Sequence, residues 1–316
     1  GMDFAARLAR ARAAALLIAV GSGLAHAQTR AEPPEPVTIA VFGDSLADGL
    51  WTGLYRAFRN DPRVAEIEQL SEVSTGLSNW RYVHVGEATR EQLRTRDVAV
   101  AVVMFGANDI QGLVHQGRVH PFRTEGWERV YRARVREVVR VLQDHGARVY
   151  WVGLPRMRSD RYDANTVFLN RLYREEAEAL GAVFIATRAI TSGPDGDYSA
   201  YLPDASGRAR LMRADDGVHF TLRGYQRLAA PVAAVVEADL DEAMRQRERR
   251  RRVAAFLRTT PVFDGARRLD EAIIAARFDE ADWLCRPAKP GEIEALDPFA
   301  DRRRRVGASA RRSGGP

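Results

Sequence analysis

Short apolar runs of strand length alternate with longer amphipathic stretches through the middle of this chain of 316 residues. The runs lie at residues 37–42, 64–73, 98–105, 149–154 and 183–185. The stretches with helical spacing lie at residues 47–59, 124–145, 160–180 and 222–243. Strands separated by helices predict a parallel sheet that is covered by helices on both faces. The predicted fold class is therefore α/β.

Several of the predicted helices have recognisable ends. Gly146 and Gly181 follow two of them, and glycine is the residue that most often ends a helix. Thr221 precedes the last helix and is a candidate N-cap residue. Residues 187–215 are rich in Gly, Pro, Ser and Asp, so we expect an irregular loop there.

The N-terminal segment has the pattern of a secretory signal peptide. Arg7, Arg10 and Arg12 form a basic start, an apolar stretch follows at 13–24, and Ala25-His26-Ala27 is a small–any–small cleavage site. The apolar stretch is shorter than the about 20 residues that a comfortable membrane span requires. We expect cleavage after Ala27 and a periplasmic or secreted location, with an uncleaved anchor as the alternative.

The remaining chain divides by composition. Residues 28–36 are a proline-rich lead, residues 37–244 carry the sheet and helix pattern, and residues 245–316 form a basic extension that is expected to be partly ordered. Within the extension, residues 269–283 could form a modest apolar helical stripe. The only cysteine of the chain, Cys285, also lies there and allows no internal disulfide.

The formal net charge of +6 comes from the extension rather than from the body of the chain. A solvated tail is one interpretation of its arginine runs, and attraction to anionic lipid head groups or an acidic envelope polymer is the other. Export from the cytoplasm and the lack of interleaved aromatic residues argue against a nucleic-acid partner.

Three four-residue segments stand beside predicted elements and carry chemistry. They are Gly43-Asp44-Ser45-Leu46, Gly106-Ala107-Asn108-Asp109 and Asp216-Gly217-Val218-His219. In an open α/β sheet, binding residues gather beyond the carboxyl ends of the strands. Together the segments supply a nucleophile, an oxyanion donor, a base and a carboxylate that orients the base, which is a complete set for acyl transfer through a serine.

Ser45 is the predicted nucleophile, because it lies where an apolar strand meets a helix. A helix N-cap serine is the alternative interpretation. His219 is the predicted base, since it is the histidine with a carboxylate three residues earlier in a glycine-containing turn. Asp216 would hold one ring nitrogen and leave the other free for Ser45, and the adjacent Asp215 could compete for that role.

The oxyanion of a tetrahedral intermediate requires hydrogen-bond donors. Asn108 is predicted to donate its side-chain amide, and Ser45 its backbone N–H. Gly76 is the candidate for a third donor, because a glycine permits close approach of the backbone. An Asx-turn residue at Asn108 and an ordinary turn glycine at Gly76 are the alternatives. Asp109 is expected to fix its loop rather than to take part in the chemistry.

These segments resemble blocks I, III and V of the SGNH (GDSL-type) hydrolases, and Ser74-Thr75-Gly76 resembles block II. The stretches Gly153-Leu154-Pro155-Arg156-Met157 and Asp216-Gly217-Val218-His219-Phe220-Thr221 resemble a secreted proteobacterial branch of that superfamily, whose substrates are mostly unassigned. The resemblance covers residues 37–240 and implies a three-layer, flavodoxin-like α/β/α sandwich and ester hydrolysis. It also implies Ser45 as nucleophile, Asp216 and His219 as the orienting pair, and Gly76 and Asn108 as oxyanion donors.

The expected function is that of a periplasmic serine esterase without a cofactor, which removes a short acyl group such as acetyl from an envelope carbohydrate. Acyl transfer to a sugar hydroxyl is a close variant. A glycan-binding or assembly protein that keeps the fold is an alternative from a different class. Metal-dependent hydrolysis is disfavoured, because the sequence has no His-x-His, His-x-x-x-His or Cys-x-x-Cys spacing to accompany its carboxylates at positions 44, 48, 109, 215 and 216.

Overall fold

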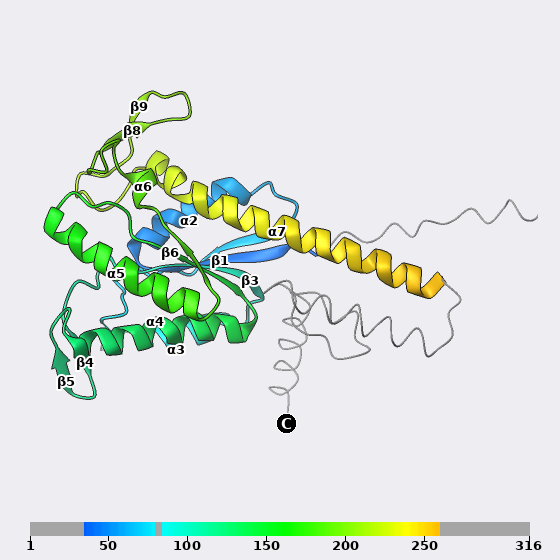
Figure 1. Cartoon of the computed structure of the whole chain (residues 1–316), viewed down its shortest axis with the longest axis horizontal. Coiled ribbons are helices and arrows are strands. Elements are labelled where there is room, and N and C mark those ends of the chain that lie inside the picture. Colours follow the sequence, from blue (N-terminus) through cyan, green and yellow to red (C-terminus); the bar gives the residue numbers. More distant parts are fainter. Residues whose placement is uncertain (1–34, 80–83, 260–316) are drawn as a thin grey trace, which may run out of the picture. The chain divides into compact units, whose positions relative to one another are not determined.

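The computed structural model describes residues 35–79 and 84–259, and its centre is a parallel sheet of five strands (Figure 1). The strand order is β2-β1-β3-β6-β7. The strands are β1 (Val37–Gly43), β2 (Val64–Gln69), β3 (Val98–Met104), β6 (Arg148–Val152) and β7 (Val183–Ile185). The predicted strands are confirmed, although β2 ends four residues earlier than the apolar run suggested.

Helices cover both faces of the sheet, which makes the predicted three-layer α/β/α sandwich (Figure 1). One face is covered by α2 (Ser45–Phe58) and α7 (Leu222–Thr259). The other is covered by α3 (Val85–Leu93), α4 (Glu125–His145) and α5 (Asp160–Ala179). From β1 the chain continues to β2, which lies on one side of it, whereas from β3 the chain continues to β6 on the opposite side. The direction in which strands are added to the sheet therefore reverses between β1 and β3. The carboxyl ends of these two strands are the expected place for a site.

Burial explains why the sequence pattern predicted these strands and helices. Every residue of β3 is buried between the helical layers, so this strand is a continuous apolar run. Helix α4 begins after Thr124, whose side chain accepts a hydrogen bond from the N–H of Trp127, and ends at Gly146 in a left-handed conformation with φ 100°. These are the boundaries that the sequence predicted. At α7, Thr221 likewise accepts from the N–H of Gly224, as expected of an N-cap residue.

Short elements escaped prediction. The expected loop at 187–215 contains α6 (Arg188–Thr191) and a hairpin of β8 (Tyr201–Pro203) and β9 (Ala209–Leu211). A second hairpin, β4 (Leu113–His115) and β5 (Arg118–His120), and the helix α3 were not predicted at all. Strands of three residues are too short to show an alternating pattern, so composition alone misled the interpretation.

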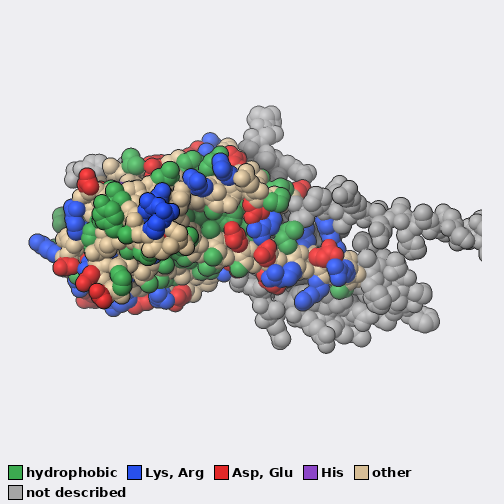
Figure 2. All heavy atoms as spheres, turned by 90° about the horizontal axis from the view of Figure 1, so that it is seen from above, with side chains coloured by type: hydrophobic (Ala, Val, Ile, Leu, Met, Phe, Trp, Pro, Cys, Tyr) green, Lys and Arg blue, Asp and Glu red, His purple; other side chains and the backbone are tan. Residues whose placement is uncertain are grey.

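The predicted end of the last helix at Ala243 is wrong, because α7 continues to Thr259 through the arginine run. Arginine is a good helix former, and glutamates one turn away pair with it. Arg245 lies 2.7 Å from Glu242, and Arg252 lies 2.9 Å from Glu248. Figure 2 shows acidic and basic side chains next to each other in this part of the molecule. The predicted boundary at 244 therefore falls inside a helix.

Other predictions concern residues outside the described ranges. The signal peptide at 1–27, the start of the lead at 28–36, the stripe at 269–283 and Cys285 are among them. Within residues 35–79 and 84–259, no helix has the length and apolarity that a membrane crossing requires.

Gly43 lets the ends of β1 and β3 approach each other. Its φ is 145°, a conformation that residues with a side chain rarely adopt, and an added Cβ would lie 1.9 Å from the carbonyl oxygen of Met104. The next residue, Asp44, donates its backbone N–H to that same oxygen at 3.2 Å. The turn that leads into α2 therefore depends on a glycine at this position.

We expect Gly43→Ala to lower the free energy of unfolding by about 3 kcal/mol, because both the backbone angle and the space forbid a methyl group. Gly117→Ala is the matched control: its φ is 74° but nothing lies within 4 Å of an added Cβ, so only about 1 kcal/mol should be lost. Urea unfolding of both variants measures the difference. Equal losses would contradict the proposed role of Gly43.

Candidate active site

The structure brings together the three side chains that the sequence proposed as a catalytic triad. Ser45 Oγ lies 2.7 Å from His219 Nε2, and His219 Nδ1 lies 2.6 Å from Asp216 Oδ2. Ser45 comes from the junction of β1 and α2, while the other two come from the loop that precedes α7. Residues 174 positions apart in the sequence thus form one continuous hydrogen-bonded chain.

The helix cap at the start of α2 is Asp44 and not Ser45. The Oδ1 atom of Asp44 accepts the backbone N–H of Leu46 at 2.9 Å. The alternative interpretation of Ser45 as an N-cap residue is therefore wrong. The serine is the first residue of the helix, where backbone N–H groups have no carbonyl partner one turn earlier in the helix, and its hydroxyl contacts His219.

Asp44 also joins the serine segment to the segment that carries Asn108. Its Oδ2 atom accepts the backbone N–H groups of Gly106 and Ala107, both at 2.9 Å, and the residue is fully buried. Burial raises the pKa of Asp44 to about 7; the backbone hydrogen bond from Leu46 opposes this rise, and the nearby charge of Asp109 adds to it. Sequence reasoning counted Asp44 only among possible metal ligands, although an Asp directly before a helix is a common cap.

Asn108 and Gly76, the predicted oxyanion donors, lie side by side. The amide of Asn108 donates a hydrogen bond to the carbonyl of Thr75 at 2.8 Å, and this carbonyl belongs to the peptide that leads into Gly76. An added Cβ at Gly76 would lie 2.3 Å from Oδ1 of Asp109, so the position requires a glycine.

Asp109 was expected to fix its own loop, and the structure shows that it also holds this loop to the one that carries Gly76. It is fully buried and accepts hydrogen bonds from the backbone N–H and the hydroxyl of Ser78, each at 2.8 Å, and from the Tyr131 hydroxyl at 2.7 Å. Burial raises the pKa of Asp109, and these hydrogen bonds oppose the rise. One carboxylate therefore holds the Gly76 loop against the Asn108 loop and α4.

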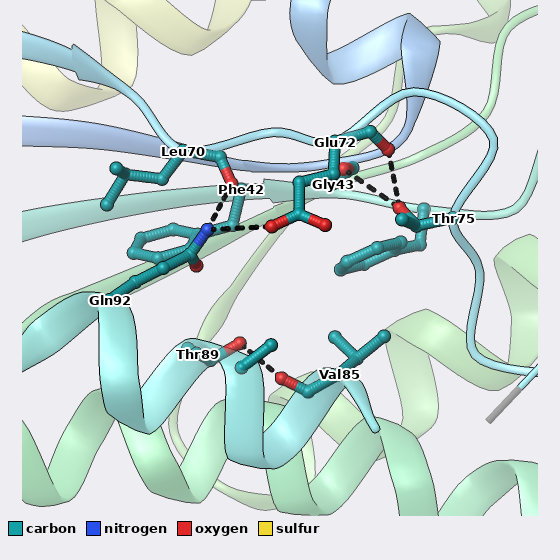
Figure 3. Close-up of a pocket in the computed structure, with 10 residues that line it drawn as sticks. Phe42, Gly43, Leu70, Glu72, Thr75, Val85, Thr89 and Gln92 are labelled. Carbon is teal, nitrogen blue, oxygen red and sulfur yellow. Dashed lines mark hydrogen bonds between the residues drawn. The ribbon is translucent and has the colours of Figure 1, made fainter. Parts of the chain in front are cut away.

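The loop before Gly76 packs closely on the sheet and on α3 (Figure 3). The hydroxyl of Thr75 donates to the carbonyl of Glu72 at 2.6 Å and lies 3.4 Å from that of Gly43, and Gln92 donates to the carbonyl of Leu70 at 3.1 Å. The cavity that remains between them has a volume of about 20 Å³, which holds no more than one water molecule. The end of β1 and the helix α3 therefore hold the loop before Gly76 in place.

Asp216, and not its neighbour Asp215, orients His219. Besides the ring nitrogen, the carboxylate of Asp216 accepts the backbone N–H groups of Val218 and His219 at 2.8 and 2.9 Å. Partial burial acts to raise the pKa of Asp216, but these hydrogen bonds outweigh it and lower the pKa to about 2. The carboxylate is therefore ionised at neutral pH, accepts the proton of Nδ1 and leaves Nε2 as the acceptor that faces Ser45.

Four of the five carboxylates that the sequence offered as metal ligands, those of Asp44, Asp48, Asp109 and Asp216, have hydrogen-bond partners within the protein. Asp48, for example, is contacted by the side chains of Gln69 and Ser71. Over residues 35–79 and 84–259, no three or more His, Cys, Asp or Glu side chains are grouped so that they could hold a metal ion.

Residues 38–235 match the family model described as "Protein of unknown function (DUF459)". The chain belongs to this family. DUF459 is SGNH-hydrolase-like, which confirms the superfamily that the four sequence segments indicated. The match begins in β1 and ends within α7, so it contains every residue of the candidate site.

Solved structures with a similar fold include a GDSL-like lipase from Bacteroides thetaiotaomicron, with 11% identity and a TM-score of 0.44 over 65% of this chain and 88% of that one. The periplasmic domain of a lipopolysaccharide acetyltransferase from Salmonella ser. Paratyphi A has 12% identity and a TM-score of 0.45 over 65% and 85%. An acetyl-xylooligosaccharide esterase mutant from Geobacillus has 17% identity and a TM-score of 0.43 over 62% and 92%. No curated protein matches the sequence significantly.

Arg213 is a further residue of this DUF459 site whose role sequence reasoning missed. Its side chain is almost fully buried and donates to the carbonyls of Arg156, Gly217 and Val218, the last two at 3.2 and 3.0 Å. Its guanidinium stacks 4.2 Å from the ring of Phe220. Burial lowers the pKa of Arg213 to about 10, so it is still charged at neutral pH. It holds the backbone between Asp216 and His219.

We expect Arg213→Met to release this loop, because the two carbonyls between Asp216 and His219 lose their buried donor. The low-field proton NMR signal of the His219 Nδ1–H, which reports its short hydrogen bond to Asp216, should broaden or disappear. The free energy of unfolding should fall by about 3 kcal/mol. Arg210→Met, which removes a half-exposed arginine from the nearby hairpin, should change neither quantity appreciably. An unchanged low-field signal in Arg213→Met would contradict the positioning role.

Proposed function

We propose that this DUF459 protein is a periplasmic serine esterase that removes short acyl groups, such as acetyl, from an envelope carbohydrate. The observation that carries the proposal is the hydrogen-bonded chain from Ser45 through His219 to Asp216, with contacts of 2.7 and 2.6 Å. A serine hydroxyl is a weak nucleophile unless a base accepts its proton, and this geometry supplies the base and its orienting carboxylate.

In the proposed reaction, Ser45 Oγ attacks the ester carbonyl while His219 Nε2 takes the hydroxyl proton. The ionised Asp216 stabilises the imidazolium that forms. The negative charge that develops on the carbonyl oxygen is stabilised by hydrogen bonds from three donors, the backbone N–H groups of Ser45 and Gly76 and the side-chain amide of Asn108. His219 then protonates the departing alcohol and an acyl-enzyme remains. Water, activated by His219, releases the acid and restores the serine.

Three further observations support this assignment. The site is open, since the side chains of His219 and Asp216 are 34% and 50% exposed, which suits a bulky, polymeric substrate. The DUF459 match supports a hydrolase of the SGNH type. The signal-peptide pattern of residues 1–27 supports a periplasmic location, where envelope carbohydrate is the available polymer.

The same open site favours a second candidate, acyl transfer to a sugar hydroxyl. The acyl-enzyme is common to both reactions, and the exposed His219 could activate a sugar hydroxyl as it would a water molecule. Product analysis with an added oligosaccharide separates the two, because only the transferase yields an acylated sugar.

We expect Ser45→Ala to abolish hydrolysis of p-nitrophenyl acetate while the variant remains folded. Asn108→Ala should retain the nucleophile and lose one oxyanion donor, which costs on the order of 10²–10³ in turnover. Steady-state kinetics with circular dichroism as the folding control measures both effects. Full activity of the Ser45→Ala protein would refute the assignment.

Labelling with a fluorophosphonate probe separates catalysis from a pure binding role. The probe reacts with an activated serine, so the wild-type protein should be labelled at Ser45 and the His219→Gln variant should not. A wild-type serine that is inert to the probe would favour the alternative of a glycan-binding or assembly protein.

A further inference from the structure

A recess with a volume of about 690 Å³ lies between the β4–β5 hairpin and α4, and none of the proposed catalytic residues lines it. Its size falls within the range of small-molecule and sugar sites. His115, Arg118 and His120 line it from the hairpin, and Arg129, Arg134 and Glu137 from the helix. Basic groups therefore dominate its wall.

The hairpin face that is directed at α4 carries three basic side chains and one buried apolar side chain, Leu113. Leu113 pairs with His120 and His115 pairs with Arg118, so these four side chains share the face that is directed at α4. The other face carries Val114 and Val119, which are 42% and 72% exposed. A hairpin that only had to pack would bury its valines, so the inward basic face indicates a function for the recess.

Two of the recess arginines are available for a ligand. Among residues 35–79 and 84–259, no hydrogen bond or ion pair is made by the guanidinium group of Arg118 or of Arg129. Glu137, the only carboxylate among the described residues of the lining, lies 3.2 Å from Arg90 of α3 and so already has a cationic partner. The recess thus has a surplus of positive charge and two free guanidinium groups, which suit the paired oxygens of a carboxylate.

The recess is built on fixed elements. The buried Arg134 donates to the carbonyl of Val114 at 2.9 Å and to that of Leu77 at 2.6 Å, which ties the hairpin to α4 and to the loop after Gly76. The hairpin turns through Gln116 and Gly117, whose φ angles of 49° and 74° match a tight two-residue turn. The hairpin and the helix that carry the lining residues are therefore fixed to each other by Arg134.

We infer that this recess binds an acidic sugar through its carboxylate, between Arg118 of the hairpin and Arg129 of α4. The hairpin belongs to the connection between β3 and α4, which also carries Asn108. A polymer held here by one sugar unit has other units free to reach beyond the recess. That the bound sugar belongs to the substrate rests on the proposed esterase function; the anion site itself does not.

The test measures binding separately from turnover. Isothermal titration calorimetry of the full chain with an oligogalacturonate, at constant physiological ionic strength, should show binding that a neutral oligosaccharide of the same length does not show. Arg118→Gln and Arg129→Gln should each weaken the affinity about tenfold, because each removes one charged pair of hydrogen bonds. Hydrolysis of p-nitrophenyl acetate should stay unchanged in both variants.

Arg140→Gln is the matched control, since Arg140 is exposed on the same helix but does not line the recess. It should change the affinity by less than about twofold. Equal weakening by Arg140→Gln and Arg129→Gln would overturn the inference, because the attraction would then be a general effect of charge. Equal binding of the acidic and the neutral oligosaccharide, or no binding of the acidic one, would also overturn it. If the wild-type protein binds the acidic oligosaccharide but hydrolyses no ester, the proposed esterase function is refuted and the anion site is not.

Discussion

One buried carboxylate connects the parts of the candidate site that the sheet brings near each other. Asp44 caps α2 with one oxygen and accepts two backbone N–H groups of the β3 connection with the other. A buried carboxylate is costly unless it is hydrogen-bonded, and the raised pKa of Asp44 reflects that cost. The three backbone donors offset it. The position of Ser45 relative to Asn108 is therefore set by Asp44 rather than by the strands alone.

The loop that carries His219 depends on a buried arginine, as the segment that carries Ser45 depends on the buried Asp44. Arg213 bonds two carbonyls of the loop that runs from Asp216 to His219, and this loop is otherwise short and half-exposed. The contact between Ser45 and His219 joins the two halves. Fixed donors and acceptors of this kind are valuable in a site for acyl transfer, because the groups need not rearrange when charge develops.

The sequence predicted the parts whose signal is long or chemically distinctive. β3 was recognised because both its faces are buried, and α4 because its apolar stripe ends at Gly146. The three triad residues were identified because each lies in a short segment whose residue types suit nucleophilic catalysis by a serine. They are Ser45, Asp216 and His219. Because the carboxyl ends of parallel strands lie at one edge of a sheet, these residues were expected to come together there.

The remaining features have no local signal. A single arginine in a polar segment, such as Arg213, shows its role only when the carbonyls around it are known. Asp44 and Asp109 look alike in sequence, and only burial reveals that each one joins two loops. The β4–β5 hairpin was missed because its strands have three residues each. Helix α7 continued where a change of composition suggested an end, because charge does not by itself interrupt a helix.

If Ser45 is the nucleophile, it becomes covalently acylated during turnover. Rapid acid quenching of the enzyme with excess p-nitrophenyl acetate, followed by peptide mapping by mass spectrometry, tests it directly. We expect a single acetyl group on the peptide that contains Ser45. Turnover without any acetylated peptide, or with acetylation at another residue only, would contradict it.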